Sequence, residues 1–167
     1  MNIVFLCLGG NLGNREANLS TSMAKISQLC GKIKYQSSIY ETEAWGSSSQ
    51  LKYLNQVIQI QTTYLPEQLL NMLLQIEKSL GRERNNSQNA DRTMDIDILF
   101  FNDEIIETNT LQIPHPRLHL RNFVLQPLKN INEDFFHPKL KKTIKQLSLQ
   151  CNDTSKVSIF KKNNIFF

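Results

Sequence analysis

Asp95 and Asp97 are separated by a single residue inside residues 92–101, a run that predicts a strand. Side chains two residues apart share one face of a strand and lie roughly 6.6 Å apart along it. Such paired oxygens suit a hard divalent cation, and a carboxylate-held metal with arginine nearby is the usual equipment for handling nucleotide phosphates. Arg82, Arg84 and Arg92 precede the pair and favour a phosphate site. A half-exposed strand with two solvated acids remains the alternative.

The length and charge of the chain narrow the class of protein. With 167 residues, 40% hydrophobic and 20% charged, the chain predicts one globular domain spanning residues 1–167. A formal net charge of +4 favours an anionic partner, which could be nucleic acid, a membrane surface or a phosphorylated small molecule. The lysines near the C-terminus are spread among polar residues and predict a solvated face rather than a site.

The cysteines and the first residues bear on the cellular compartment. Cys7, Cys30 and Cys151 are odd in number, far apart and without CxxC spacing, so they suggest neither a disulfide framework nor a zinc site. A reducing cytoplasm is therefore expected. The apolar residues 3–8 follow no basic segment and are too short to span a bilayer, so they predict a buried strand rather than a signal peptide or an anchor.

Apolar periodicity predicts the order β-α-β-β-α-β. The expected strands cover residues 2–8, about 32–40, 55–62 and a stretch from Asp95 onward. The expected helices end at Gly31 and run from Pro66 to Gly81. Further on, we expect a short helix introduced by residues 114–116 and closed by Pro127, a weaker helix at about 140–149 and a last strand at 157–160. The polar loop that follows Gly81 is typical of functional segments.

This order matches the ferredoxin-like supersecondary pattern. It predicts an α+β sandwich, a mainly antiparallel sheet with helices packed on one face, and leaves the opposite face free for polar chemistry. The sequence contains neither a GxxxxGK[ST] loop nor GxGxxG. Any handling of phosphate must therefore rely on metal and arginine rather than on a glycine-rich cradle.

Several separate motifs occur in the order of one enzyme family. They are Gly9-Gly10-Asn11-Leu12, Tyr40-Glu41-Thr42-Glu43, Tyr53-Leu54-Asn55, Glu77 with Gly81-Arg82, Arg92-Thr93-Met94-Asp95-Ile96-Asp97-Ile98, Pro114-His115-Pro116-Arg117-Leu118 and Arg121-Asn122-Phe123-Val124-Leu125-Gln126-Pro127-Leu128. Together they resemble the 6-hydroxymethyl-7,8-dihydropterin pyrophosphokinases of folate biosynthesis. The resemblance covers about residues 2–128.

The resemblance implies a ferredoxin-like fold and a reaction. The β and γ phosphates of ATP, the co-substrate, pass as a unit to the hydroxymethyl oxygen of the pterin, which attacks the β-phosphorus and leaves AMP. Two Mg²⁺ ions held by Asp95 and Asp97 are implied, because paired cations about 4 Å apart can clamp the attacking and bridging oxygens. The implied partners are these small molecules, with no nucleic acid and no membrane, and we expect a monomer.

On the nucleotide side, Arg82 and Arg92 match the family's mobile catalytic arginines, whose planar guanidinium groups suit phosphate oxygens. The matching nucleotide-binding positions are Glu77, Arg84, Ile98, Gln112, His115 and Arg121. Ile98 and Gln112 correspond to the adenine pocket, partly through backbone. Alternative interpretations are that Glu77, next to the apolar face of a helix, is simply exposed, and that His115, between two prolines, caps a turn.

On the pterin side, Tyr53 and Phe123 match the two aromatic rings that sandwich the heterocycle, and Asn55 matches the amide that pairs with its edge. Stacking plus an amide with both a donor and an acceptor is what such a heterocycle requires. The remaining positions implied to face the pterin are Gly9, Thr42, Glu43 and Trp45. Aromatic residues beside strands are also common in ordinary cores, which is the alternative for both rings.

The chain departs from the family where an aromatic residue, glycine and proline usually precede the second arginine, because Asn89-Ala90-Asp91 stands there. We expect looser loop closure, a negative charge from Asp91 near phosphate, and weaker sealing rather than loss of activity. Trp45 could partly fill the vacated aromatic role. Two other classes stay open: an RNA-binding module, although its signature string is absent and the acids would repel phosphate, and a silent pterin or nucleotide sensor.

Overall fold

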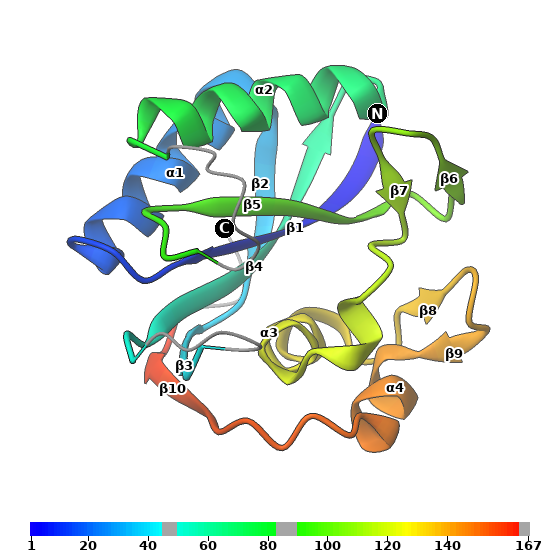
Figure 1. Ribbon diagram of the computed structural model, residues 1–167. Coiled ribbons are helices and arrows are strands. Elements are labelled where there is room, and N and C mark those ends of the chain that lie inside the picture. The colour runs from blue at the N-terminus through cyan, green and yellow to red at the C-terminus, as the bar shows by residue number, and fades with distance from the viewer. Residues whose placement is uncertain (45–49, 83–89, 164–167) are drawn as a thin grey trace.

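The computed structural model describes residues 1–44, 50–82 and 90–163, and its centre is an antiparallel sheet (Figure 1). The sheet strands are β1 (Asn2–Gly10), β2 (Lys32–Gln36), β3 (Ile39–Thr42), β4 (Tyr53–Thr62), β5 (Asp95–Phe101) and β10 (Val157–Lys161). They lie in the order β10-β3-β4-β1-β5, with β2 also paired to β4. The first strand of the chain is therefore central, with neighbours that come from the third and fourth predicted strands.

Two long helices, α1 (Arg15–Leu29) and α2 (Pro66–Ser79), cover one face of the sheet. Helix α1 begins where the Asn14 side chain accepts a hydrogen bond from the backbone N–H of Ala17, the usual N-cap arrangement. Helix α2 begins at a proline, whose missing N–H costs nothing in the first turn. Gly81, with φ of +82°, follows α2 and directs the chain toward the site.

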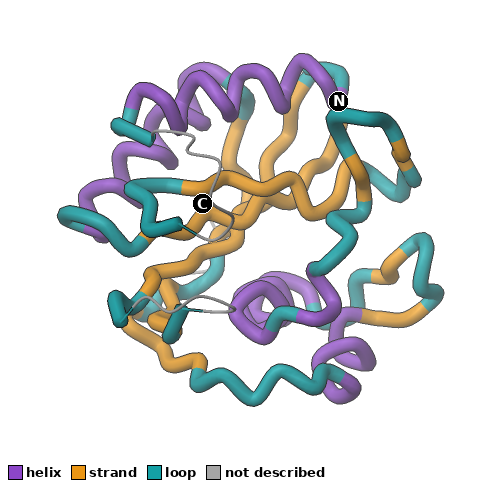
Figure 2. The backbone as a smooth tube through the Cα atoms, viewed as in Figure 1, coloured by secondary structure: helices purple, strands orange, loops and turns teal. Residues whose placement is uncertain are grey.

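The opposite face is covered in part by α3 (Asn122–Asn132) and α4 (Ile144–Gln150), which lie below the sheet in Figures 1 and 2. One apolar cluster of the core lies under α1 and α2. A second cluster joins α3 and α4 to the sheet and includes Phe5, Val57, Phe100 and Leu125. The prediction of a free second face is therefore wrong. The reason is that the side chains of β1 and β5 pack into two apolar clusters, one on each face of the sheet, as in strands that are buried on both faces.

Smaller elements complete the fold. They are β6 (Ile106–Glu107), β7 (Gln112–Ile113), a 3-10 helix (Leu118–Leu120), β8 (Phe136–His137) and β9 (Lys142–Thr143). Within the described residues, no helix combines the length and the apolar character needed to cross a bilayer.

The structure corrects three further predictions. The strand expected at 32–40 is interrupted at Ser37 and Ser38, because Ser37 bonds to Val57 through both its backbone N–H and its hydroxyl. Pro127 lies inside α3 rather than closing it, since burial of neighbouring apolar side chains offsets the lost hydrogen bond. The helix expected at 140–149 runs from 144 to 150. The α+β sandwich itself is confirmed.

Candidate active site

Strand register brings the predicted acids beside the predicted pterin residues. Gly9 on β1 lies between Asp95 on β5 and Asn55 on β4, and Cys7 lies opposite Asp97. Residues paired across a sheet share a face, so these side chains point to the same side as α3. Asp95, Asp97 and Asn55, with Gly9 between Asp95 and Asn55, form one polar row on this face.

Two arginines pair with one carboxylate. One oxygen of Asp95 accepts a hydrogen bond from Nη1 of Arg82, and its other oxygen lies 3.1 Å from Nη1 of Arg92. Arg82 also pairs with Glu77, which is 2% exposed and accepts the backbone N–H of Ile96 at 2.7 Å. Glu77 is thus buried, unlike the exposed glutamate that is usual beside a helix stripe, and it ties α2, Arg82 and the start of β5 together.

Asp97 and His115 are electrostatically unusual. Burial, and then the charge of Asp95, raise the pKa of Asp97 to about 7, while Arg121 opposes that shift. Burial and the nearby arginines 121 and 117 lower the pKa of His115 to about 4, so its ring is neutral at pH 7. The Nδ1 atom accepts the backbone N–H of Arg117 at 3.2 Å, and Nε2 lies 3.9 Å from Asp97.

The carboxylates of Asp95 and Asp97 suit a hard cation whose coordination is completed by oxygens of a bound substrate. Asp95 and Asp97 each offer carboxylate oxygens from side chains that are only partly buried. In the described part of the chain, no three His, Cys, Asp or Glu side chains gather as a metal site. Mg²⁺ is commonly held by one or two carboxylates together with phosphate oxygens and water, so two acids meet the requirement if a nucleotide binds here.

The predicted pterin residues lie at the other end of the polar row. Asn55 is 2% exposed and donates from Nδ2 to the hydroxyl of Thr42 at 2.8 Å. A Cβ at Gly9 would lie 2.6 Å from the Asn55 amide oxygen, so only glycine leaves that amide undisturbed. The guanidinium of Arg92 lies 5.8 Å from the centre of the Tyr53 ring, which links the acid and aromatic ends of the site.

Other predicted residues are placed differently. Arg121 lies 5.5 Å from the centre of the Phe123 ring, which brings this predicted phosphate contact next to a predicted pterin ring. The Ile98 side chain packs in the core cluster under α1 and α2, so it could contribute only backbone to a ligand. Gln112 on β7 and Glu43 after β3 are exposed. The predictions for Trp45, Arg84 and Asn89 lie outside the described residues.

Asn11 is a residue of the site that sequence reasoning missed. It belongs to the first of the matching motifs, yet the motif alone implies no role for it. The structure shows Asn11 to be 5% exposed and bonded to Asp91 and Arg92. Its position directly after a strand and two glycines was the available signal, because asparagine in turns often bonds to backbone groups.

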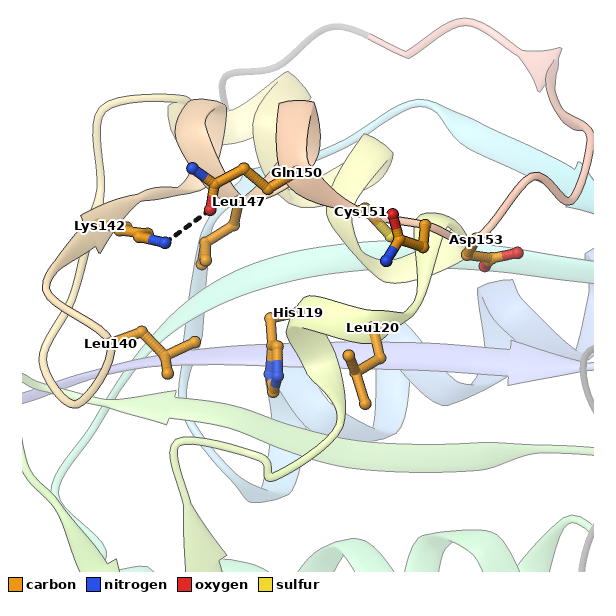
Figure 3. Close-up of a pocket in the computed structure, with 9 residues that line it drawn as sticks. His119, Leu120, Leu140, Lys142, Leu147, Gln150, Cys151 and Asp153 are labelled. Atoms are coloured by element: carbon orange, nitrogen blue, oxygen red, sulfur yellow. Dashed lines mark hydrogen bonds between the residues drawn. The ribbon is translucent and has the colours of Figure 1, made fainter.

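A separate pocket of about 240 Å³ lies between the 3-10 helix and α4 (Figure 3). His119 and Leu120 line one side, and Lys142, which donates to Gln150 at 2.6 Å, lines another. Among the described residues of the predicted site, none contributes to its lining. This pocket therefore does not belong to the polar row.

Paired carboxylates with two arginines, beside a buried amide and an aromatic ring, are typical of an α+β enzyme of the phosphate-transfer class. The model of the 7,8-dihydro-6-hydroxymethylpterin-pyrophosphokinase (HPPK) family matches residues 5–133. This chain belongs to that family, as the motifs in its sequence indicated.

Relatives agree with this assignment. The chain is 36% identical over 146 residues to the 2-amino-4-hydroxy-6-hydroxymethyldihydropteridine pyrophosphokinase of Aquifex aeolicus, covering 87% of this chain and 90% of that one. It is 44% identical over 131 residues to the enzyme of the same name from Bacillus subtilis, covering 78% of each.

A solved structure shares the fold. The wild-type HPPK-DHPS of Plasmodium falciparum, crystallised with STZ-DHP, matches 89% of this chain with a TM-score of 0.70 and 21% identity. The chain spans 41% of the length of that protein.

Proposed function

We propose that this chain transfers a pyrophosphoryl group from ATP to the hydroxymethyl oxygen of 6-hydroxymethyl-7,8-dihydropterin, giving the pterin diphosphate and AMP in folate biosynthesis. Membership of the HPPK family supports the reaction class. The observation that carries the site assignment is the polar row in which Asp95, Gly9 and Asn55 lie side by side on three adjacent strands.

Asp95 and Asp97 are proposed to hold two Mg²⁺ ions together with phosphate oxygens. When bound, these ions would neutralise charge on the transferred group. Burial first, and then the negative charge of Asp95, raise the pKa of Asp97. The second cause supports the proposed metal site, because two carboxylates on one face repel each other until a cation compensates them. Arg82 and Arg92 both pair directly with Asp95, while Arg121 and Arg92 offset part of the pKa shift at Asp97.

The arginines are proposed to move from Asp95 to the phosphates when nucleotide and metal bind. The Nε atom of Arg92 is buried and has no hydrogen-bond partner among the described residues, so it has a donor to offer. A guanidinium near the β-phosphate would stabilise charge that develops as the bond to the α-phosphate oxygen breaks. Arg84, Arg121 and His115 are proposed to contact the nucleotide, the last through its neutral ring. Glu77, which pairs with Arg82, is proposed to belong to the same nucleotide site.

The pterin is proposed to stack between Tyr53 and Phe123 while Asn55 reads its amide edge. The hydrogen bond from Asn55 to Thr42 supports this role, since it fixes the amide orientation and leaves the amide oxygen to accept from the ligand. The remaining proposed contacts are Gly9, Glu43 and Trp45 on the pterin side, and Ile98 and Gln112 at the adenine.

We also propose that residues 1–167 act as one domain, as a monomer, in the cytoplasm. The free thiols of Cys7, Cys30 and Cys151 support a reducing compartment. Light scattering after size-exclusion chromatography tests the monomer directly, because a dimer would elute with twice the mass.

The reaction is tested by incubating the purified protein with Mg²⁺, the pterin and ATP labelled separately in its β or γ phosphate. We expect both labels to appear in the pterin product and AMP to be released in equal amount. Transfer of the γ label alone, with ADP as the product, would contradict the proposal. Binding of either ligand with no product would instead indicate a sensor.

A further inference from the structure

Asn11 joins two segments that are about eighty residues apart in the chain. Its Nδ2 atom donates to Oδ1 of Asp91 at 2.6 Å, and its Oδ1 atom accepts the backbone N–H of Arg92 at 2.9 Å. Both polar atoms of the Asn11 side chain are therefore hydrogen-bonded, and the residue is 5% exposed. A buried amide satisfied on both atoms fixes geometry more strictly than a solvated one does.

The backbone of the same turn holds the other side of Arg92. The carbonyl of Arg92 accepts the N–H groups of Asn11 at 3.0 Å and of Leu12 at 3.2 Å. Asn18 of α1 donates from Nδ2 to the next carbonyl, that of Thr93, at 3.4 Å. The N–H and the C=O of Arg92 are thus both bonded to the turn that ends β1.

Close packing leaves this junction little freedom to move. A Cβ built on Gly10 would lie 2.2 Å from the Thr93 carbonyl oxygen, so the two backbones are in direct contact. From this fixed point the Arg92 side chain extends to Asp95, 3.1 Å away, and over the Tyr53 ring.

We propose that Asn11 and Asp91 form a positioning pair that sets where the Arg92 guanidinium stands in the active site. The inference rests on the proposed function, because it gives Arg92 a role in the chemical step. Asp91 is exposed, and its carboxylate acts by holding the Asn11 amide in the orientation that bonds to Arg92. The acid therefore supports the reaction rather than merely repelling phosphate.

Asp91→Ala and Asp91→Asn separate the hydrogen bond from the charge. The alanine variant removes the acceptor, and we expect its kcat to fall about tenfold, the lower end for a hydrogen bond to a charged group, with pterin Kd unchanged. The asparagine variant keeps an acceptor oxygen and should retain most of the wild-type kcat. Asp134→Ala removes an exposed acid beyond α3 and serves as the matched control with unchanged kcat.

A reciprocal exchange gives a stricter test. Asn11→Asp alone places two carboxylates against each other and should lower kcat more than Asp91→Ala does. Adding Asp91→Asn to it restores one donor and one acceptor with their positions exchanged, and we expect most of the lost kcat to return. Circular dichroism melts of each variant establish that folded protein is compared.

The test also asks whether the pair acts through Arg92. In an Arg92→Ala background, adding Asp91→Ala should lower kcat no further, because the group to be positioned is gone. Independent losses in that background, a wild-type kcat for Asp91→Ala, or an asparagine variant as slow as the alanine variant would each overturn the inference. Absence of pyrophosphoryl transfer by the wild-type protein would instead overturn the proposed function.

Discussion

Gly9 and Gly10 are neighbours, yet the same substitution at each should damage a different half of the site. A Cβ at Gly9 would lie 2.6 Å from the amide oxygen of Asn55, whereas real Cβ contacts stay above 3.0 Å. In Gly9→Ala the amide must therefore shift by at least about 0.4 Å. Because Asn55 is also tied to Thr42, the shifted amide cannot keep that bond and align with a pterin at once.

The expected loss follows from the hydrogen bonds at stake. Misaligning one or two of them costs about 1–3 kcal/mol in total, which corresponds to a rise of roughly 5-fold to 150-fold in the Kd for the pterin. Isothermal titration with 6-hydroxymethyl-7,8-dihydropterin measures this value directly. The kcat at saturating pterin should change much less, because the acids and arginines are untouched.

Gly10→Ala is the matched comparison. Its Cβ would meet the backbone oxygen of Thr93 at 2.2 Å, and a backbone cannot swing aside as a side chain can. We expect it to lose about 1–3 kcal/mol of stability in urea unfolding and to lower kcat by displacing Arg92, with little change in pterin Kd. A folded Gly9→Ala protein that binds the pterin within twofold of wild type would refute the reasoning.

Three further predictions concern charge and the C-terminal strand. Burial raises the pKa of Asp97 to about 7, so between pH 4 and 7 the folded protein keeps a proton that the unfolded chain has released, and in metal-free buffer the free energy of unfolding falls as pH rises over this range. In urea unfolding, Asp97→Asn should therefore gain stability relative to wild type from pH 4 to 7, and a difference that does not change with pH would argue against this. Arg82→Ala should lower the rate constant of pyrophosphoryl transfer in single-turnover assays at least about 100-fold and leave the pterin Kd within twofold, so a change confined to binding would count against its role. Deleting residues 156–167 removes β10, which pairs with Thr42 and Glu41, and should lower Tm and weaken pterin binding; equal Tm and Kd would show that β3 needs no support.

Much of the sheet could be predicted because its strands are short apolar or alternating runs bounded by turn residues. The spacing of Asp95 and Asp97 is by itself enough to place both acids on one face. The pairing of β1 with β4 and β5 follows from the β-α-β-β-α-β order. The second apolar face could have been inferred from the unbroken run at residues 3–8, which is typical of a strand covered on both sides. The expectation of a polar face there overlooked that run.

The contacts between distant segments could not be predicted. Nothing local in the sequence shows that Asn11 bonds to Asp91, since the two residues meet only when β1 and β5 pair. The burial of Glu77 is similar, because it depends on the backbone N–H of Ile96 on another element. Pro127 inside α3 shows the reverse case, in which tertiary packing outweighs a strong local signal.

The most direct test of the carboxylate pair is the Mg²⁺-dependent turnover of Asp95→Ala and Asp97→Ala, followed as AMP released in the presence of the pterin. We expect each variant to fold as wild type by circular dichroism, to bind the pterin normally, and to lose about three orders of magnitude or more in kcat. A folded variant of either residue with near-normal turnover would contradict the assignment of these acids as the metal-holding centre of the site.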